Sequence, residues 1–196
     1  MRNVFQCAAA AVALTLVGPS VVAAQRPQTR AGWWLSAGTG VAVRGYGCRG
    51  CDTLSTQPRG LGPTLRLRLG GTFTSQLLLA MQVDVWLKSA SGVSSFAGLL
   101  SPAFYYYPSD TGSFFFGFGF GHLGYAGKDG SDNVISNGLG LIVGVGRDYR
   151  IGPNVSFTPV VNLILGGLGA LNANDVLQGR NYNQTMLEVG VGITLH

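Results

Sequence analysis

The chain has 196 residues, enough for one domain and a short export segment. Apolar residues make up 46% of it and charged residues only 11%, whereas a soluble domain carries about 25% charged residues. Its formal net charge of +5 comes mainly from arginines spread along the chain, without a basic patch interleaved with aromatic residues, which argues against nucleic-acid binding. After residue 24, no apolar run approaches the roughly 18 residues that a membrane-spanning helix needs. Because only helices and closed barrels satisfy their backbone groups inside lipid, this composition favours a membrane β-barrel.

The N-terminus has the pattern of a cleavable signal peptide. Arg2 supplies a positive start, residues 7–17 form a short apolar stretch, and small residues ending at Ala24 provide a cleavage site. A membrane anchor is the alternative, but the apolar stretch is too short for one. The predicted organisation is a signal peptide at 1–24, a short N-terminal segment at 25–32 and an outer-membrane barrel at 33–196.

Beyond the N-terminal segment, apolar residues recur at every second position. This period is typical of strands that have one apolar face. In the clearest stretch, Leu77, Leu79 and Met81 alternate with less apolar or small residues, and the pattern continues to Leu87. The stretches with this alternation are 33–43, 65–70, 77–88, 96–107, 113–125, 139–148, 155–166 and 187–195. They predict an all-β fold, an eight-stranded antiparallel up-and-down transmembrane β-barrel.

The segments between the predicted strands alternate in length. The short ones lie at 74–76, 108–112 and 151–154. The long polar ones lie at 44–62, 88–95, 126–137 and 168–184. Bacterial outer-membrane barrels have short periplasmic turns and longer outer loops, so this order predicts that both chain ends are periplasmic.

Aromatic residues gather near both ends of the predicted strands, and we expect them to form two girdles at the membrane interfaces. The periplasmic girdle would contain Trp33, Trp34, Phe73, Tyr105, Tyr106, Tyr107, Phe114, Phe115, Tyr149 and Phe157. The outer girdle would contain Tyr46, Trp86, Phe96 and Tyr125.

A secreted, lipocalin-like soluble barrel that binds a small ligand is the main structural alternative, since it also has eight alternating strands. In such a barrel the apolar face points inward and the other face meets water. Here the other face consists mostly of glycine, serine and threonine with few charges. It would make a poor water-facing surface but a suitable interior for a narrow barrel.

The strand pattern and the order of the connections resemble those of the small OmpA-like and OmpX-like outer-membrane barrels, over about residues 31–196. The resemblance implies the fold and carries no diagnostic motif. No peptidoglycan-binding domain follows the barrel in this sequence, so the anchoring role of the two-domain members is not implied. Family members usually end in an aromatic residue that the barrel-assembly machinery recognises, whereas this chain ends in Leu195 and His196.

Cys48 and Cys51 lie close together in the first long connection. In an oxidising compartment two such cysteines usually form a disulfide, and we expect that bond here. A zinc site would need about four ligands, which His122 and His196 at opposite ends of the barrel do not supply. We therefore expect no metal and no cofactor.

Five charged residues share the inward parity of their predicted strands: Arg66, Arg68, Asp84, Asp148 and Glu188. Lys88 has the same parity. Isolated charges are costly in a narrow lumen, so residues of opposite sign should meet there. We expect a structural charge network, with a gated proton or ion path as the alternative.

His122 has the outward parity of the phenylalanines that precede it. The resemblance raises the alternative of a lipid A-modifying enzyme, because deacylases of this kind use an outward histidine and a serine two positions later. Gly124 occupies that second position here. The resemblance therefore favours a non-enzymatic outer-membrane protein with a structural role, or one that contacts a surface partner through its outer loops. The other expected partners are outer-membrane lipid and lipopolysaccharide, whose phosphates suit arginine, and the barrel-assembly machinery.

Overall fold

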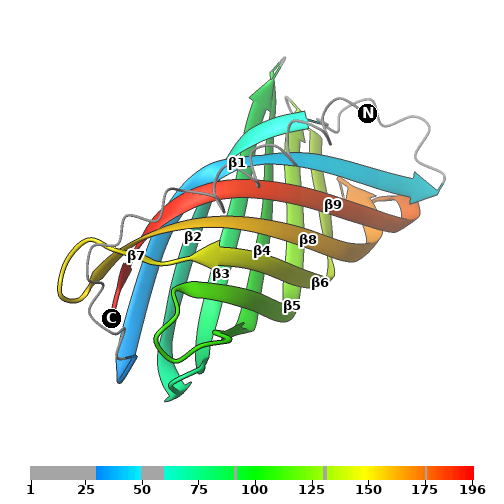
Figure 1. Cartoon of the computed structure of the whole chain (residues 1–196). Coiled ribbons are helices and arrows are strands. Elements are labelled where there is room, and N and C mark those ends of the chain that lie inside the picture. The colour runs from blue at the N-terminus through cyan, green and yellow to red at the C-terminus, as the bar shows by residue number, and fades with distance from the viewer. Residues whose placement is uncertain (1–29, 50–59, 91, 130–131, 175) are drawn as a thin grey trace, which may run out of the picture.

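The computed structural model describes residues 30–49, 60–90, 92–129, 132–174 and 176–196, which form one sheet curved into a barrel (Figure 1). Its strands are β1 (Trp33–Arg49), β2 (Gly60–Thr74), β3 (Leu77–Ala90), β4 (Val93–Tyr106), β5 (Phe114–Asp129), β6 (Asp132–Arg147), β7 (Tyr149–Arg150), β8 (Val155–Ala173) and β9 (Val176–Leu195). The order is β6-β5-β4-β3-β2-β1-β9-β8-β7, and pairing of β6 with β8 closes the sheet.

The barrel wall has eight antiparallel strands. The two-residue β7 follows β6 after Asp148 and pairs with the same neighbour, β8, so it continues β6. Consecutive strands pair along the chain, and β1 pairs with β9. The predicted eight-stranded up-and-down barrel is confirmed. Among the residues that the structure describes, no helix is long and apolar enough to cross a membrane.

Apolar side chains cover the outside of the barrel and polar ones enter the lumen. In β2, Leu65 and Leu67 are 54% and 50% exposed, whereas Arg66 between them is 4% exposed. The alternation follows from strand geometry, since successive side chains point to opposite faces of a sheet. A soluble ligand-binding barrel has the opposite arrangement, so the lipocalin-like alternative is excluded and the chain is a membrane barrel.

The two ends of the barrel differ. At the turn end, β2 meets β3, β4 meets β5 and β7 meets β8 through short connections. The opposite end, here called the far end, is where β3 meets β4, β5 meets β6 and β8 meets β9. The prediction of long loops at the far end is wrong for these three connections: the strands continue until 91–92, 130–131 and 174–175 separate them. The fourth predicted loop, 44–62, is strand up to Arg49 and again from Gly60.

The far-end extensions lack a regular two-residue alternation because polar and small residues, such as Lys128 and Asn133, interrupt the apolar ones on both faces. Backbone pairing nevertheless continues through them, as between Lys128 of β5 and Asn133 of β6. Asn174 adopts a positive φ of 48° in the β8–β9 connection, and its backbone N–H donates to the carbonyl of Asn133 (3.0 Å). Antiparallel neighbours can satisfy backbone groups whatever the side chains are, so polar sequence alone does not end a strand.

The predicted aromatic girdles are wrong in part, because they were assigned by position along the strand without regard to facing. At the far end, Phe96 points outward (42% exposed), whereas Trp86 and Tyr125 are buried and Tyr46 is half-buried. At the turn end, the exposed aromatic residues are Trp33, Phe73, Tyr106 and Phe157. The buried ones there are Trp34, Tyr105, Tyr107 and Phe115. About half of the residues predicted for the girdles therefore point into the lumen.

The facing of the strands predicts the effect of a charge at mid-membrane depth. Val143 lies on the outward face of β6, between Phe118 of β5 and Leu163 of β8. An arginine there costs roughly 2–4 kcal/mol because it must face hydrocarbon. We expect Val143→Arg to lower the folded fraction after refolding into lipid vesicles, measured by the mobility shift between heated and unheated gel samples. Ser89→Arg, on an exposed position beyond the apolar band, is the matched control and should fold like the parent. Equal folding of both variants would mean that the facing is wrong.

Candidate functional site

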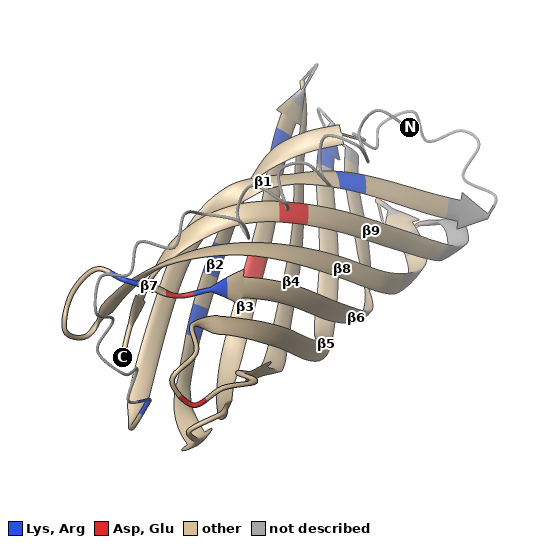
Figure 2. Cartoon of the chain, viewed as in Figure 1, with Lys and Arg blue, Asp and Glu red and all other residues tan. Residues whose placement is uncertain are grey.

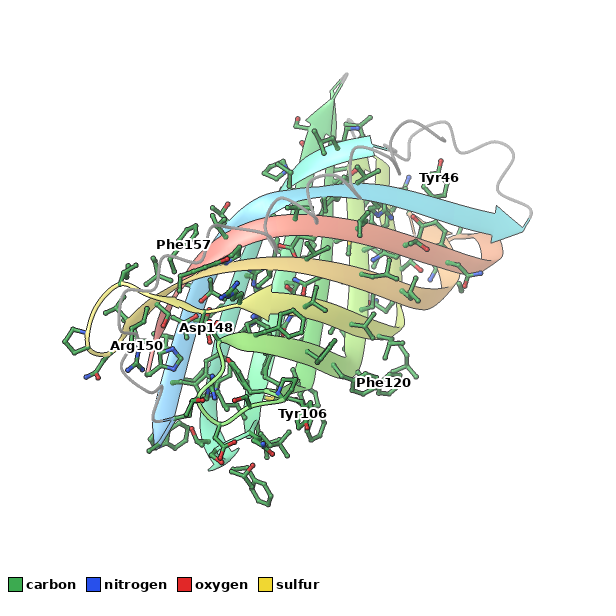
Figure 3. All side chains as sticks on the ribbon, viewed as in Figure 1. Tyr46, Tyr106, Phe120, Asp148, Arg150 and Phe157 are labelled. Atoms are coloured by element: carbon green, nitrogen blue, oxygen red, sulfur yellow. The ribbon has the colours of Figure 1, made fainter. Side chains whose placement is uncertain are left out.

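The polar interior of the barrel is the candidate site, since charges are sparse along the wall (Figure 2) and most of the described ones turn inward. The lumen contents form three layers along the barrel. A charged central layer lies between an aromatic layer at the turn end and another aromatic layer at the far end. In Figure 3, Arg150 marks the turn end and Tyr46 the far end.

Glu188 of β9 is the hub of the central layer. Its Oε1 accepts hydrogen bonds from Arg66 Nη1 (3.0 Å) and Thr64 Oγ1 (2.8 Å). Its Oε2 accepts one from Asn162 Nδ2 of β8 (2.6 Å). All of these side chains are buried, so hydrogen bonds from one cation and two neutral donors replace the water that would otherwise solvate the carboxylate. The ion pair joins β9 to β2 over the inward face of β1, the strand that lies between them.

Asp84 of β3 lies opposite Arg66 of β2 in the sheet register, but it takes other partners. Its Oδ2 accepts a short hydrogen bond from the side-chain amide of Gln82, whose own oxygen accepts one from the Tyr105 hydroxyl. Its buried Oδ1 accepts no hydrogen bond from any described residue. Asp84 is therefore held less completely than Glu188.

Glycines make room for the central layer. A Cβ at Gly38 would lie 2.7 Å from Nη2 of Arg66, closer than real Cβ contacts come. A Cβ at Gly144 would collide with Oδ1 of Asn162, the residue whose Nδ2 donates to Glu188. The glycine content thus has a structural reason: an eight-stranded barrel is narrow, and inward positions opposite long side chains have space only for hydrogen.

Aromatic rings fill the lumen at the turn end. Tyr105 packs edge-on against Trp34 (5.3 Å between ring centroids) and against Phe115 (5.7 Å). Tyr107 also packs against Phe115 (5.3 Å). Arg68 lies over the Tyr105 ring, with its guanidinium carbon 4.7 Å from the centroid, and so connects this layer to the central one.

Arg30 closes the turn end across these rings. Its guanidinium lies 3.5 Å from the centroid of Tyr107. It donates to the backbone carbonyl of Ser75 (3.3 Å), to that of Asp110 (3.1 Å) and, in a short contact, to that of Gly112. One side chain from the segment before β1 therefore ties together the β2–β3 and β4–β5 turns.

Asp148 provides negative charge beside Arg30. It accepts hydrogen bonds from the Tyr107 hydroxyl (2.8 Å) and from Thr158 Oγ1 (2.7 Å). Burial lowers the pKa of the Arg30 guanidinium, while Tyr107 and Asp148 oppose that shift. Burial also raises the pKa of Tyr107, and the carboxylate of Asp148 raises it further, so the phenol stays a donor. Asp148 thus belongs to the turn-end layer and is not a partner of Glu188.

Arg44 is the centre of the far-end layer, where it is 1% exposed. Its guanidinium carbon lies 4.3 Å from the ring centroid of Tyr125 and 5.3 Å from that of Trp86. It donates to Gln184 Oε1 (3.1 Å) and to the Tyr182 hydroxyl. A cage of aromatic faces and neutral oxygens therefore surrounds this cation, which suits a guanidinium better than an ammonium because it is planar and more weakly hydrated.

The five predicted lumen charges do not form a single network in the structure. All are buried: Arg66 and Glu188 form an ion pair, Arg68 and Asp84 flank it, and Asp148 lies nearer the turn end. Sequence reasoning missed Arg44 and Arg30. Arg44 continues the inward parity of Ser36 and Ala42, but the predicted strand ends at residue 43, whereas β1 continues to Arg49. Arg30 precedes the first strand, where no periodic pattern could indicate its direction.

Two other predictions involve residues that the structure does not describe in full. The signal peptide at 1–24 lies outside the described residues, and so does Cys51 of the expected disulfide. Cys48 is the next-to-last residue of β1 rather than a loop residue. At the other terminus, His196 donates its backbone N–H to Asn154 (2.9 Å), and its Nε2 lies 3.1 Å from Ser156 Oγ.

His122 points outward from β5 between Leu100 and Leu139 of the neighbouring strands. Gly124 follows it on the same face, so the position at which the resemblance would require a serine has no side chain. Within the described residues, no three His, Cys, Asp or Glu side chains lie close enough together to hold a metal ion.

Similar solved structures include bacterial outer-membrane barrels. Neisserial surface protein A superposes with a TM-score of 0.54 at 16% identity, covering 83% of this chain and 96% of its own. Outer membrane protein OprG from Pseudomonas aeruginosa superposes with a TM-score of 0.48 at 13% identity, and the match covers 86% of this chain and 98% of OprG. No protein-family model matches the sequence, and no curated protein matches it. The chain thus has the fold of a small outer-membrane barrel, as the resemblance implied.

The ion pair of the central layer predicts a coupled loss of stability. Glu188→Gln leaves Arg66 buried without its charged partner, which should lower the free energy of unfolding by about 3–5 kcal/mol. Adding Arg66→Gln should recover part of the loss, because neither charge then remains alone. Urea unfolding in lipid vesicles, followed by tryptophan fluorescence, measures both.

Asp84→Asn is the matched control, and we expect it to be tolerated better than Glu188→Gln because Asp84 already has an oxygen without a partner. Strictly additive effects of the Glu188 and Arg66 substitutions would show that the pair is not coupled.

The contacts of Arg30 predict that it orders the turn end. Arg30→Ala removes charged hydrogen bonds to the two turns, which should cost about 1.5–3 kcal/mol. Arg30→Lys should recover only part of this, since an ammonium lacks the planar fork. Hydrogen exchange of the Gly112 amide, which donates to Ser109, should become faster in Arg30→Ala. Unchanged exchange there, together with unchanged stability, would contradict the role of Arg30.

Proposed function

We propose that the protein is a non-enzymatic, non-conducting outer-membrane barrel that supports the membrane and presents its far end at the cell surface. The observation that carries the proposal is the filled lumen. Side chains of the three layers occupy it from Arg30 at the turn end to Arg44 at the far end. A barrel whose interior is packed in this way would bind its partners on its outer surface and not in its lumen.

The packing of the central layer supports this conclusion in detail. The cavity between Asp84, Glu188 and Trp86 has a volume of about 10 Å³. That volume is about what a single water molecule requires. Four buried arginines among the described residues, Arg30, Arg44, Arg66 and Arg68, would in addition oppose the passage of cations. A packed eight-stranded barrel differs in this respect from the wide aqueous channels of 16-stranded porins.

Membrane orientation follows the usual arrangement of outer-membrane barrels, in which short turns face the periplasm. Strand β1 begins and β9 ends at the turn end, next to the 151–154 connection. The extended far end would then reach beyond the outer leaflet. Neisserial surface protein A, which has the same fold, carries a surface location in its name. A surface partner of this protein would meet the far end.

Export and assembly complete the proposal. Residues 1–24 would direct secretion and be removed, and the oxidising periplasm would join Cys48 to Cys51. Val191, Ile193 and Leu195 keep the outward apolar alternation at the end of β9 that the barrel-assembly machinery would encounter.

The filled lumen predicts that the purified barrel does not conduct. In planar bilayers at 1 M KCl (roughly a 3 Å screening length), the folded protein should give no discrete current steps, because described side chains occupy the lumen from Arg30 to Arg44. A wide porin added to the same membrane controls for detection. Reproducible steps from the wild-type barrel, absent from a heat-unfolded sample, would overturn the proposal.

A further inference from the structure

The outer surface of the barrel has a groove near the far end, separate from the packed lumen. It has a volume of about 390 Å³ and crosses β3 to β6. Phe96 of β4 and Ile135 of β6 form its walls and are 42% and 50% exposed. Ala126 of β5 lies between them in the sheet register, so a small side chain forms the floor between two large ones.

Lys128 lies next to the apolar part of the groove, on the side toward the far end. The next outward row toward the far end consists of Ser94, Lys128 and Asn133, which are aligned across the same three strands. All three are exposed and line the groove. Below the groove, the outward face continues into apolar residues such as Leu100 and Leu139. The groove therefore lies at the boundary where the lipid-facing surface becomes polar.

An amide-rich hollow adjoins the groove on the side of β8. It has a volume of about 500 Å³ and is lined by Asn133, Ile135, Asn172 and Asn174. Asn133 and Ile135 of β6 line both hollows, so the two lie on either side of these side chains. Amide side chains both donate and accept hydrogen bonds, which suits sugar hydroxyls.

We propose that this surface binds one phosphorylated acyl glycolipid, the lipopolysaccharide of the outer leaflet. An acyl chain would lie over Ala126 between Phe96 and Ile135, a phosphate would meet Lys128, and sugar hydroxyls would meet the asparagine amides. Lys128 lies one row nearer the far end than Phe96, Ala126 and Ile135, as a phosphate lies beyond the acyl chain in the lipid. The asparagine amides lie beside these two rows on β8, where Asn172 pairs with Ile135, so a sugar attached to the phosphate would reach them sideways. A phospholipid would use the apolar walls and Lys128 but would leave the asparagine hollow empty.

The site rests on the proposed function only through the orientation of the barrel, since lipopolysaccharide occupies the outer leaflet. Binding can be measured on the purified folded barrel, where orientation plays no part. Orientation can be measured in cells, where binding plays no part. The two results therefore fail independently.

The binding test uses native mass spectrometry of the full mature barrel in detergent, with purified rough-type lipopolysaccharide as the probe. Lys128→Gln should weaken binding about fivefold, which is the usual contribution of one cation at an anionic lipid surface. Ala126→Leu should weaken it at least as much, because the larger side chain fills the floor. Arg147→Gln is the matched control, an outward arginine at the opposite end of β6. Its affinity should equal that of the wild type.

Two results of this test would overturn the site. Unchanged affinity in both Lys128→Gln and Ala126→Leu would show that the lipid binds elsewhere. Equal competition by phosphatidylglycerol would show that any anionic lipid suffices and that the asparagine hollow has no part.

The orientation test labels single cysteines in a C48S/C51S background with a membrane-impermeant maleimide. Ser89→Cys at the far end should react on intact cells, and Ser109→Cys at the turn end only after permeabilisation. The reverse pattern would overturn the proposed surface function. It would not change the affinity measured on the purified barrel.

Discussion

Every second side chain of each strand has to enter a lumen that is only wide enough for packed side chains. Closing eight strands into a barrel satisfies the backbone and removes every sheet edge, but it leaves the inward side chains without bulk water. Their polar atoms must therefore bind one another. The ion pair between Arg66 and Glu188 meets this requirement at the centre, where Thr64 and Asn162 supply the remaining donors.

The same constraint explains why two arginines near the ends of the lumen have aromatic surroundings. Arg44 and Arg30 each lie against tyrosine rings and donate to neutral oxygens. A guanidinium tolerates such an environment because its charge is spread over a plane that stacks on a ring. Aromatic residues that could have served as interface girdles are used instead as lumen filling, as Trp86 and Tyr125 are at the far end.

Because the lumen is filled, other molecules can contact only the outer wall and the ends of the barrel. The outward face is apolar over the membrane depth and changes character near Phe96, Lys128 and Asn133. The extensions of β5, β6 and β8 carry this polar surface as ordered strand rather than as loop. Ordered strands hold side chains in fixed register, so rows across three strands can act together on one lipid.

The sequence by itself determined the number of strands, their direction of facing and the burial of Arg66 and Glu188, because a period of two residues is set by local backbone geometry. It did not determine which charges meet. Parity puts Asp84 and Arg66 on one face, but the Arg66 side chain reaches over β1 and pairs with Glu188 of β9. Strand length was also decided by tertiary structure, because polar extensions such as 126–129 remain strands only through hydrogen bonds to their neighbours. The place of Arg30 required the assembled turns, since its acceptors at 75, 110 and 112 come together only when the barrel closes.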